Sequence, residues 1–329
     1  MKAIVCEKYG PPEVLELKEM EKPTPKDNEV LVKVHATSLN AYDWRMQRAD
    51  PFLVRLMGGG LLKPKNKILG ADMAGRIELI GRNVTQFKPG DDVFGDLAGY
   101  GQGAFAEYVC APENALALKP AKITFEEAAA VPMAAVTALQ GLRDTGRIRK
   151  GQKVLINGAS GGVGTFAVQI AKSFGAEVTA VCSTGKMEMA RAIGADHVID
   201  YTKEDFTKNG QHYDLIFAVN GYHPILDYKS ALKPDGIYVM AGGSMSQMFQ
   251  ALLLGPLVSM IGNKKIRAVS AKPNQKDLIF IKELIEAGKV KPVIDRRYSL
   301  REVPQALQYL WEGHARGKVV ITVEYNNKT

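Results

Sequence analysis

The sequence has few cysteines and no metal-ligand spacing. Among its 329 residues there are three cysteines, Cys6, Cys110 and Cys182, which lie far apart. No Cys-x2-Cys or His-x3-His spacing is present, and the five histidines are scattered. A disulfide framework and a cysteine-rich zinc site are therefore excluded, and a reducing compartment is favoured. We expect neither a structural nor a catalytic zinc ion.

Export and membrane insertion are not predicted either. The N-terminus carries charges at Lys2, Glu7 and Lys8, where a signal peptide needs an apolar run. The most apolar segment, residues 248–261, is only 14 residues long and contains Gly255 and Pro256. This is shorter than the roughly 20 residues that span a bilayer. We therefore expect a cytoplasmic protein with no transmembrane span.

Charge is in moderate positive excess. Lys and Arg number 43 against 35 Asp and Glu, which gives a net charge of +8 and a pI near 9.2. Such a charge suits nucleic acid, an anionic membrane surface or a phosphate-bearing small molecule. The longest basic runs are pairs such as Lys264-Lys265, without interleaved aromatic residues. No nucleic-acid partner is therefore predicted.

The length and the strand pattern predict two domains. At roughly 150 residues per domain, the chain is long enough for two. Residues 29–36 and 76–81 are β-branched and nearly alternating, which indicates an antiparallel sheet or barrel, and strand character returns at 292–294 and 318–323. We expect residues 1–124 and 273–329 to form one domain, with 125–272 inserted as the other.

The inserted domain is predicted to be α/β. Helix-length patterns such as 164–174 and 186–193 separate short apolar strands. Such alternation implies a parallel sheet covered on both faces, and six strands match a doubly wound nucleotide-binding domain. A further helix at 277–287 follows the 3.6-residue period. The six strands are predicted at 153–156, 177–182, 197–200, 213–219, 236–240 and 265–269.

A glycine-rich turn follows the first of these strands. From Ala159 to Gly164 the chain has the spacing Ala-x-Gly-x-x-Gly, a variant of the dinucleotide fingerprint. Positions without side chains let the backbone approach a pyrophosphate, and the N-terminus of the following helix stabilises its charge. A nicotinamide dinucleotide is therefore predicted. The alternative is a merely structural tight turn.

The end of the second strand favours NADPH. About 20 residues beyond Gly161, an NAD site places Asp or Glu on the adenine ribose. Here the chain reads Ser183-Thr184-Gly185-Lys186, without a carboxylate. Two hydroxyls and an ammonium group can bind a 2′-phosphate, which a carboxylate would repel. The alternative is that Ser183 caps the next helix and Lys186 is a solvated surface charge.

Further motifs are distributed over the whole chain. They include Tyr9-Gly10-Pro11-Pro12, Ser38-Leu39-Asn40-Ala41-Tyr42-Asp43, Gly70-Ala71-Asp72-Met73-Ala74-Gly75 and His314-Ala315-Arg316-Gly317-Lys318. With the glycine loop, they resemble the zinc-free quinone oxidoreductase and enone or alkenal reductase branch of the medium-chain dehydrogenase/reductase superfamily. The resemblance implies a GroES-like, mostly antiparallel β catalytic domain and a Rossmann NADP-binding domain. Zinc-dependent relatives have Cys or His where this chain has Asn40, Ala71 and Ala134, so the resemblance also implies no metal.

The resemblance assigns cofactor contacts position by position. The glycine loop would hold the pyrophosphate, and the turn after the second strand would surround the 2′-phosphate. Other loops would line the nicotinamide ribose and complete the cofactor cleft, with Lys318 as a further basic candidate. For Tyr201 and His314, an ordinary strand-end aromatic and a surface histidine are the alternatives. The implied contacts are Ala159, Ser160, Gly161, Gly162, Val163 and Gly164; Ser183, Thr184, Lys186 and Tyr201; Asn220, Gly221, Ala241, Gly242 and Gly243; and Thr137, His314, Ala315 and Arg316.

The chemistry must proceed without a metal or a Tyr-x3-Lys dyad, because neither is found. Hydride transfer to a quinone or an enone gives a delocalised oxyanion, which needs only hydrogen-bond donors and a late proton. The resemblance places Asn40, Tyr42, Asp43 and Tyr100 near the nicotinamide. Asn40 would donate to the substrate oxygen, and Tyr42 or Tyr100 would donate a proton or stack on a ring. The alternatives are that Asp43 caps a helix at 44–49 and that the tyrosines pack.

We therefore expect an NADPH-dependent, metal-free oxidoreductase of hydrophobic quinones or enones, present as a homodimer. Residues 245–261 would form an apolar wall of the substrate site or, alternatively, a dimer contact. Two other functions stay open. One is a reductase of aldehydes or enoyl thioesters on the same scaffold, and the other is a non-catalytic protein that senses NADPH.

Overall fold

The computed structural model describes residues 1–52, 54–55, 60–243, 247, 250, 255–260 and 263–325. They form two compact units. Unit 1 comprises Met1–Met133, Pro273–Glu286 and Pro292–Thr329, and unit 2 comprises Ala134–Lys272 and Ala287–Lys291. The first boundary lies later than the predicted residue 124, because helix α2 (Phe125–Ala129) packs on strands of unit 1. The short segment at 287–291 joins unit 2, where Gln169 hydrogen-bonds the backbone of Lys291.

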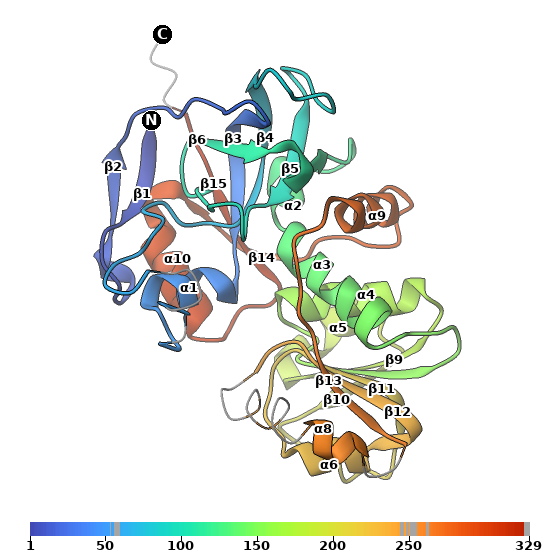
Figure 1. Cartoon of the computed structure of the whole chain (residues 1–329). Coiled ribbons are helices and arrows are strands. Elements are labelled where there is room, and N and C mark those ends of the chain that lie inside the picture. Colours follow the sequence, from blue (N-terminus) through green and yellow to red (C-terminus); the bar gives the residue numbers. More distant parts are fainter. Residues whose placement is uncertain are drawn as a thin grey trace. The chain divides into compact units, whose positions relative to one another are not determined.

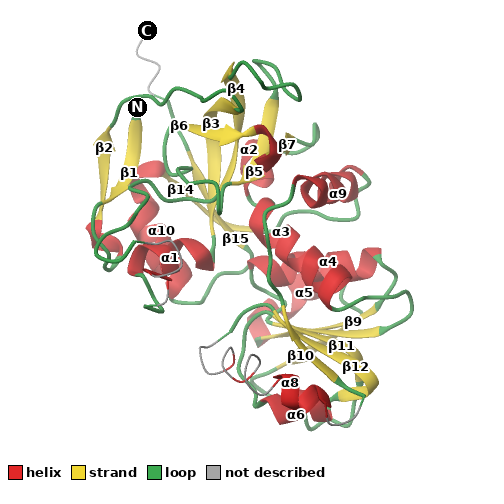
Figure 2. Cartoon of the chain, in the orientation of Figure 1, coloured by secondary structure: helices red, strands yellow, loops and turns green. Residues whose placement is uncertain are grey.

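Unit 1 is built on a mostly antiparallel sheet, as predicted (Figures 1 and 2). Its order is β14-β15-β3-β4-β5-β7, with β6 also paired to β3, and β1 pairs with β2 in a separate ribbon. The pair β14 and β15 is parallel, whereas the other pairs in the larger sheet are antiparallel. The strands are β1 (Lys2–Cys6), β2 (Leu15–Glu19), β3 (Glu29–Leu39), β4 (Asp72–Ile80), β5 (Asp92–Asp96), β6 (Tyr108–Pro112), β7 (Leu116–Leu118), β14 (Ile294–Ser299) and β15 (Lys318–Thr322).

Helices cover parts of this sheet and close its core. The long strand β3 supplies Val30, Val32 and Val34 to a buried apolar cluster that Phe105 and Leu307 complete. Burial of these side chains is the main stabilising term of the unit. The helices of unit 1 are η1 (Pro12–Val14), α1 (Ala41–Arg48), η3 (Glu113–Ala115), α2, α9 (Gln275–Glu286), η7 (Leu300–Glu302) and α10 (Val303–Trp311).

Unit 2 contains the predicted doubly wound parallel sheet. Its six strands run in the order β10-β9-β8-β11-β12-β13, and every neighbouring pair is parallel. This is the order of a dinucleotide-binding fold, and it reverses direction between β8 and β11. The strands are β8 (Lys153–Asn157), β9 (Glu177–Cys182), β10 (His197–Asp200), β11 (Tyr213–Ala218), β12 (Leu232–Met240) and β13 (Lys265–Ala268).

Because all neighbouring strands of unit 2 are parallel, they end at the same edge of the sheet. The helices of unit 2 are α3 (Pro132–Leu139), which begins at the end of unit 1, the π-helical η4 (Gln140–Thr145), α4 (Gly162–Ser173), η5 (Thr184–Lys186), α5 (Met187–Ala192), α6 (Ile225–Ser230) and α8 (Gly255–Met260). The carboxyl edge of such a sheet is where open α/β folds bind ligands. The sheet therefore brings together the loops that the sequence singled out.

Some predictions need adjustment. The strand predicted at 292–294 begins only at Ile294 and continues to Ser299, and α1 begins at Ala41 rather than at Trp44. Most of residues 245–261, including Phe249 and Leu252–Leu254, lies outside the described residues, although Met260 is exposed. In the described part of the chain, no helix combines the length and the apolarity that a membrane crossing requires.

Candidate functional site

The glycine loop lies between β8 and α4, at the point where the strand order reverses. Its first residues are tied to the sheet, since the N–H groups of Gly158 and Ala159 both donate to the carbonyl oxygen of Val181, at 3.2 and 3.1 Å. Ala159 is fully buried and therefore shapes the turn. Gly161 is the N-cap of α4, and the N–H of Thr165 donates to its carbonyl oxygen at 2.9 Å. The first N–H groups of α4 have no intrahelical acceptor and can bind an anion.

The glycines of this loop have different functions. A Cβ at Gly164 would lie 2.1 Å from the carbonyl oxygen of Gly158, so the turn itself excludes a side chain there. At Gly161 the nearest atom to such a Cβ would be 3.8 Å away, and the φ of −85° is ordinary for any residue. The fold therefore does not require glycine at position 161. An open space beside free helix N–H groups fits a pyrophosphate.

The turn after β9 lies beside the end of β10. The N–H of Tyr201 donates to the carbonyl oxygen of Cys182 at 3.1 Å, and Tyr201 itself is exposed. Ser183 and Lys186 are half-buried in the same turn, and the N–H of Lys186 donates to the carbonyl oxygen of Ser183. The parallel pairing of β9 and β10 thus brings together Ser183, Lys186 and Tyr201 at one edge.

The structure adds one carboxylate that the sequence analysis missed in this region. Asp200, the last residue of β10, is buried and accepts hydrogen bonds from the hydroxyls of Thr184 and Thr202 and from the N–H of Thr202. These bonds hold the pKa of Asp200 below its usual range. The Thr184 hydroxyl is therefore directed at Asp200. A search for an acid at the end of the second strand of unit 2 does not find Asp200, because Asp200 is the last residue of the third strand.

Asn157, at the end of β8, contacts the loop that is predicted to line the nicotinamide ribose. Its side-chain amide donates to the hydroxyl of Tyr228 at 2.8 Å, and its backbone carbonyl accepts from Val219 at 2.9 Å. A Cβ at Gly221 would approach this amide nitrogen to 3.1 Å, so the loop after β11 packs closely on the end of β8. The remaining predicted positions in unit 2 follow at the same edge or on α3: Asn220, Ala241, Gly242, Gly243 and the half-buried Thr137.

Unit 1 contains a buried polar cluster around Asn40. The side-chain amide of Asn40 donates to Asp72 Oδ2 at 2.9 Å, and its oxygen accepts from Lys318 Nζ at 2.6 Å. Lys318 Nζ also lies 3.3 Å from Asp72 Oδ2, and these two side chains are 2% and 0% exposed. Ser38 and the backbone N–H of Met133 complete the shell of Asp72. Lys318, a candidate for the dinucleotide by sequence, thus has its ammonium group enclosed by Asn40 and Asp72.

Two further buried carboxyls lie in the same unit. Asp43 is fully buried, and its Oδ2 accepts from the backbone N–H of Asn40 at 2.7 Å at the start of α1. Burial raises the pKa of Asp43 to about 7, and nearby Asp72 adds to this effect. Burial and Asp72 also raise the pKa of Asp96 well above its usual range. Asp43 therefore supports the N-terminus of α1, which is the alternative role that its sequence position left open.

The two candidate tyrosines differ in their surroundings. The hydroxyl of Tyr42 accepts from Gln102 Nε2 at 3.3 Å, and burial raises its pKa above the usual value. Tyr42 therefore stays protonated at neutral pH and keeps its own proton for donation. Tyr100 is exposed on the turn that precedes Gln102. Gln102 is buried with a left-handed φ of 61°, a feature that no sequence pattern signalled.

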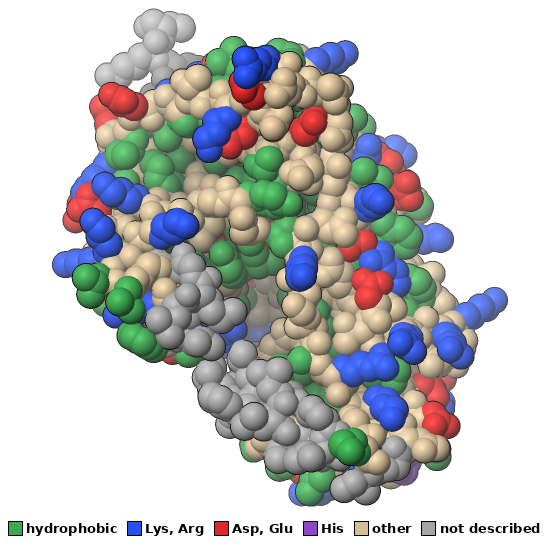
Figure 3. All heavy atoms as spheres, in the orientation of Figure 1, with side chains coloured by type: hydrophobic (Ala, Val, Ile, Leu, Met, Phe, Trp, Pro, Cys, Tyr) green, Lys and Arg blue, Asp and Glu red, His purple; other side chains and the backbone are tan. Residues whose placement is uncertain are grey.

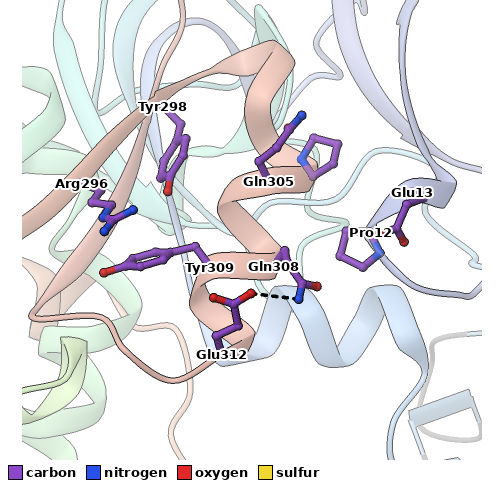
Figure 4. Close-up of a pocket in the computed structure, with 9 residues that line it drawn as sticks. Pro12, Glu13, Arg296, Tyr298, Gln305, Gln308, Tyr309 and Glu312 are labelled. Carbon is purple, nitrogen blue, oxygen red and sulfur yellow. Dashed lines mark hydrogen bonds between the residues drawn. The ribbon is translucent and has the colours of Figure 1, made fainter.

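The predicted positions after α10 border a pocket of about 550 Å³ within unit 1. The backbone N–H of Arg316 and the hydroxyl of Tyr309 both donate to Asp295 Oδ2, at 3.0 and 2.7 Å. Figure 4 shows the adjoining pocket of about 370 Å³, where Arg296 from β14 faces Tyr309 from α10. The side chains of His314 and Arg316 are exposed, with Ala315 between them. His314 and Arg316 line the larger pocket together with the acidic side chains of Asp295 and Glu312.

The residues present do not fit a zinc ion. Within the described ranges, no three His, Cys, Asp or Glu side chains are grouped so that they could hold a metal. The amide oxygen of Asn40 already accepts from the Lys318 ammonium, a positive group that would repel a cation.

Comparison with known proteins agrees with this architecture. The chain matches the alcohol dehydrogenase GroES-like domain over residues 26–121 and the zinc-binding dehydrogenase family over residues 193–321. It is 35% identical to the mitochondrial NAD(P)H oxidoreductase RTN4IP1 of Danio rerio, over 100% of this chain and 92% of that protein. It is 36% identical to the 2-methylene-furan-3-one reductase of Solanum lycopersicum, over 98% of this chain and 79% of that protein.

A solved structure extends the likeness to three dimensions. The quinone oxidoreductase from Coxiella burnetii is 30% identical and superposes with a TM-score of 0.85, over 98% of this chain and 99% of that one. Fold and sequence together define an oxidoreductase with a nicotinamide cofactor. The chain belongs to the medium-chain dehydrogenase/reductase superfamily, in the branch of the quinone oxidoreductases.

Proposed function

We propose that this protein is an NADPH-dependent, metal-free reductase of quinones or of the C=C bond of α,β-unsaturated carbonyls. The observation that carries the proposal is the open position at Gly161, beside the free N–H groups of α4 and at the switch point of the sheet. Such a cradle suits the pyrophosphate of a dinucleotide. The names of the relatives, an NAD(P)H oxidoreductase and an enone reductase, support the reaction class.

The choice of NADPH rests on the turn after β9. Ser183 and Lys186 offer a hydroxyl and an ammonium group to a 2′-phosphate, and the backbone of the exposed Tyr201 is hydrogen-bonded to Cys182, the residue before Ser183. Asp200 is close in the fold, but three hydrogen bonds from Thr184 and Thr202 stabilise its charge, and Lys203 lies 3.8 Å away. Asp200 is therefore committed to the turn and does not bind a ribose hydroxyl.

The residues of unit 1 supply donors to the substrate. When bound, the nicotinamide supplies the hydride. Asn40 donates its remaining amide N–H to the substrate oxygen, where negative charge develops as the hydride arrives. Tyr42 is protonated at neutral pH and donates the late proton, either to the phenolate oxygen of the hydroquinone anion that forms from a quinone or to the enolate that forms from an enone. Neither group polarises an unactivated ketone strongly, so conjugated acceptors are favoured.

A spectrophotometric panel tests the proposal. NADPH and NADH are each combined with 1,4-benzoquinones, alkyl enones, saturated aldehydes and an enoyl thioester, and oxidation of the cofactor is followed at 340 nm. We expect NADPH-dependent turnover of quinones or enones that chelators do not abolish. Preference for aldehydes or thioesters would support the other reductase function. Tight NADPH binding without turnover of any acceptor would support a sensing protein.

A charge reversal tests the phosphate site separately. Lys186→Glu should raise the KM for NADPH at least tenfold and change that for NADH little, because only NADPH carries the 2′-phosphate. Lys208→Glu is the matched control, since Lys208 is a surface lysine of unit 2 that pairs with Asp205 at 3.4 Å. Equal effects of Lys186→Glu on both cofactors would place Lys186 outside the phosphate site.

Location and assembly remain predictions beside this proposal. The Danio rerio relative is named as mitochondrial, whereas the present sequence favours a cytoplasmic protein. Figure 3 shows Lys and Arg side chains scattered among neutral and acidic ones over the face drawn. The homodimer predicted from sequence is testable by light scattering.

A further inference from the structure

The amide of Asn40 belongs to a closed ring of three buried side chains. Lys318 Nζ donates to Asn40 Oδ1 at 2.6 Å, Asn40 Nδ2 donates to Asp72 Oδ2 at 2.9 Å, and Lys318 Nζ lies 3.3 Å from the same Asp72 oxygen. The three residues come from the start of α1, the start of β4 and the start of β15. All three are less than 9% exposed, so water does not compete for these contacts.

The ring permits only one orientation of the amide. A flipped Asn40 would turn its N–H groups toward the Lys318 ammonium and its oxygen toward the Asp72 carboxylate, and both contacts would be repulsive. The amide oxygen is therefore held on the lysine side and the nitrogen on the aspartate side. One N–H of the nitrogen is used by Asp72, and the direction of the second N–H is fixed as a result. A group aimed in advance loses little free energy to reorganisation when charge develops opposite it.

We propose that Lys318 and Asp72 are positioning residues that fix the Asn40 amide so that its second N–H points at the substrate oxygen. This inference rests on the proposed reductase function and deepens it. The ammonium group also polarises the amide through its oxygen, which strengthens the opposite N–H as a donor. Lys318 acts through Asn40 and does not contact the dinucleotide.

If Asp72 and Lys318 only stabilised the fold, their removal would affect stability and not the orientation of the Asn40 amide. Buried ion pairs often add little to stability over apolar residues, but removal of one partner leaves a buried charge and is strongly destabilising. The test therefore uses the double variant Asp72→Asn/Lys318→Met, which removes both charges together. Thr37→Val is the matched control, since the Thr37 hydroxyl donates to the backbone oxygen of Asp72 and is fully buried, but it does not contact the amide of Asn40.

A kinetic double-mutant cycle distinguishes the two functions. Asn40→Ala should lower kcat with a quinone or enone by about 100-fold, in the range seen when one oxyanion donor is removed. Asp72→Asn/Lys318→Met should cause a similar loss alone, but less than about threefold in the Asn40→Ala background, because its target is already absent. The Kd for NADPH should not change. An equal loss in both backgrounds, or weaker NADPH binding, would overturn the inference.

NMR of the Asn40 side-chain amide tests its positioning without a measurement of catalysis. In protein labelled with ¹⁵N-asparagine, the side-chain signals of Asn40 are identified by their loss in Asn40→Ser. We expect two well-separated, slowly exchanging protons in the wild type and in Thr37→Val, and fast exchange in Asp72→Asn/Lys318→Met. Unchanged Asn40 signals in this folded double variant would overturn the positioning inference. If the signals change as expected but the wild type reduces no acceptor, the positioning stands and the proposed function fails.

Discussion

Asp72 and Asp96 are direct partners across the antiparallel pair of β4 and β5, and both are buried. Two like charges placed opposite one another destabilise a sheet, and burial adds to the cost. The two carboxyl groups avoid this repulsion in different ways. Asp72 has Lys318 as its counter-ion, whereas burial and the charge of Asp72 raise the pKa of Asp96 well above its usual range. Asp96 is therefore the member of the pair whose ionised form is disfavoured.

This asymmetry predicts opposite outcomes for two similar substitutions. Asp96→Asn removes a carboxyl whose ionised form is disfavoured by burial and by Asp72, and it puts a neutral group of the same shape in its place, so we expect an unchanged or higher Tm at pH 8. Asp72→Asn leaves the Lys318 ammonium buried without its carboxylate, and we expect a loss of about 3–5 kcal/mol in the free energy of unfolding. Chemical denaturation of both variants is the measurement. Similar losses for the two variants would show that Asp96 is ionised in the native protein.

The raised pKa of Asp43 predicts that the stability of the protein depends on pH. The native pKa of Asp43 is about 7, against a usual value of 3.8, so between these values the native state holds a proton that the unfolded state has released. Stability from this group is complete below pH 4 and is lost as the pH rises toward 7, at up to about 1.4 kcal/mol per pH unit. Asp43→Asn should flatten this slope. Thermal unfolding between pH 4 and 9 measures it.

The control for this experiment is Asp144→Asn, which removes a half-exposed carboxylate paired with Arg143. It should leave the slope unchanged. Because the pKa of Asp96 is raised as well, Asp43→Asn/Asp96→Asn should flatten the profile further than either single variant. A profile that keeps its wild-type slope in Asp43→Asn would mean that Asp43 is already ionised at acidic pH.

The two glycines of the cofactor loop predict separable effects on folding and binding. Gly164→Ala places a Cβ 2.1 Å from a backbone oxygen and should lower the Tm strongly or prevent folding. Gly161→Ala meets no protein atom within 3.8 Å, so its Tm should stay within about 2 °C of wild type. Its Kd for NADPH, measured by cofactor fluorescence, should rise at least tenfold. Unchanged binding in Gly161→Ala would remove the pyrophosphate from this position.

Much of the fold was predictable because its signals are local. The six strands of unit 2 were each found within a few residues, since continuous apolar runs of this length have few other interpretations. The glycine loop was found because its glycines have a fixed spacing. The predicted bounds of strand β14 are wrong because its sequence has no continuous apolar run. Ile294 is followed by Asp295 and by the exposed Arg296 and Arg297. Pairing with β15 gives this segment its strand conformation.

The polar cluster of unit 1 was only partly predictable. The resemblance implies Asn40 and Asp43 as site residues, but it contains Asp72 only as part of a motif and offers Lys318 as a candidate for the dinucleotide. Lys318 and Asn40 are 278 residues apart, and β15 must pair with β3 before they can meet. No short-range pattern encodes such a contact. Gln102 was missed for a similar reason, because its contact with Tyr42 spans 60 residues.

Tyr42 is predicted to be the proton donor. Its hydroxyl accepts from Gln102, and its pKa is raised by burial, so its proton remains available across the neutral range. Tyr42→Phe should lower kcat for an enone about 10- to 100-fold, with little change in the KM for NADPH, since only the late proton is affected. The solvent isotope effect on kcat should grow in the variant, because water must then deliver the proton. Tyr100→Phe is the matched control, as Tyr100 is an exposed tyrosine of the same unit. A large loss in Tyr100→Phe with wild-type activity in Tyr42→Phe would reassign the donor to Tyr100.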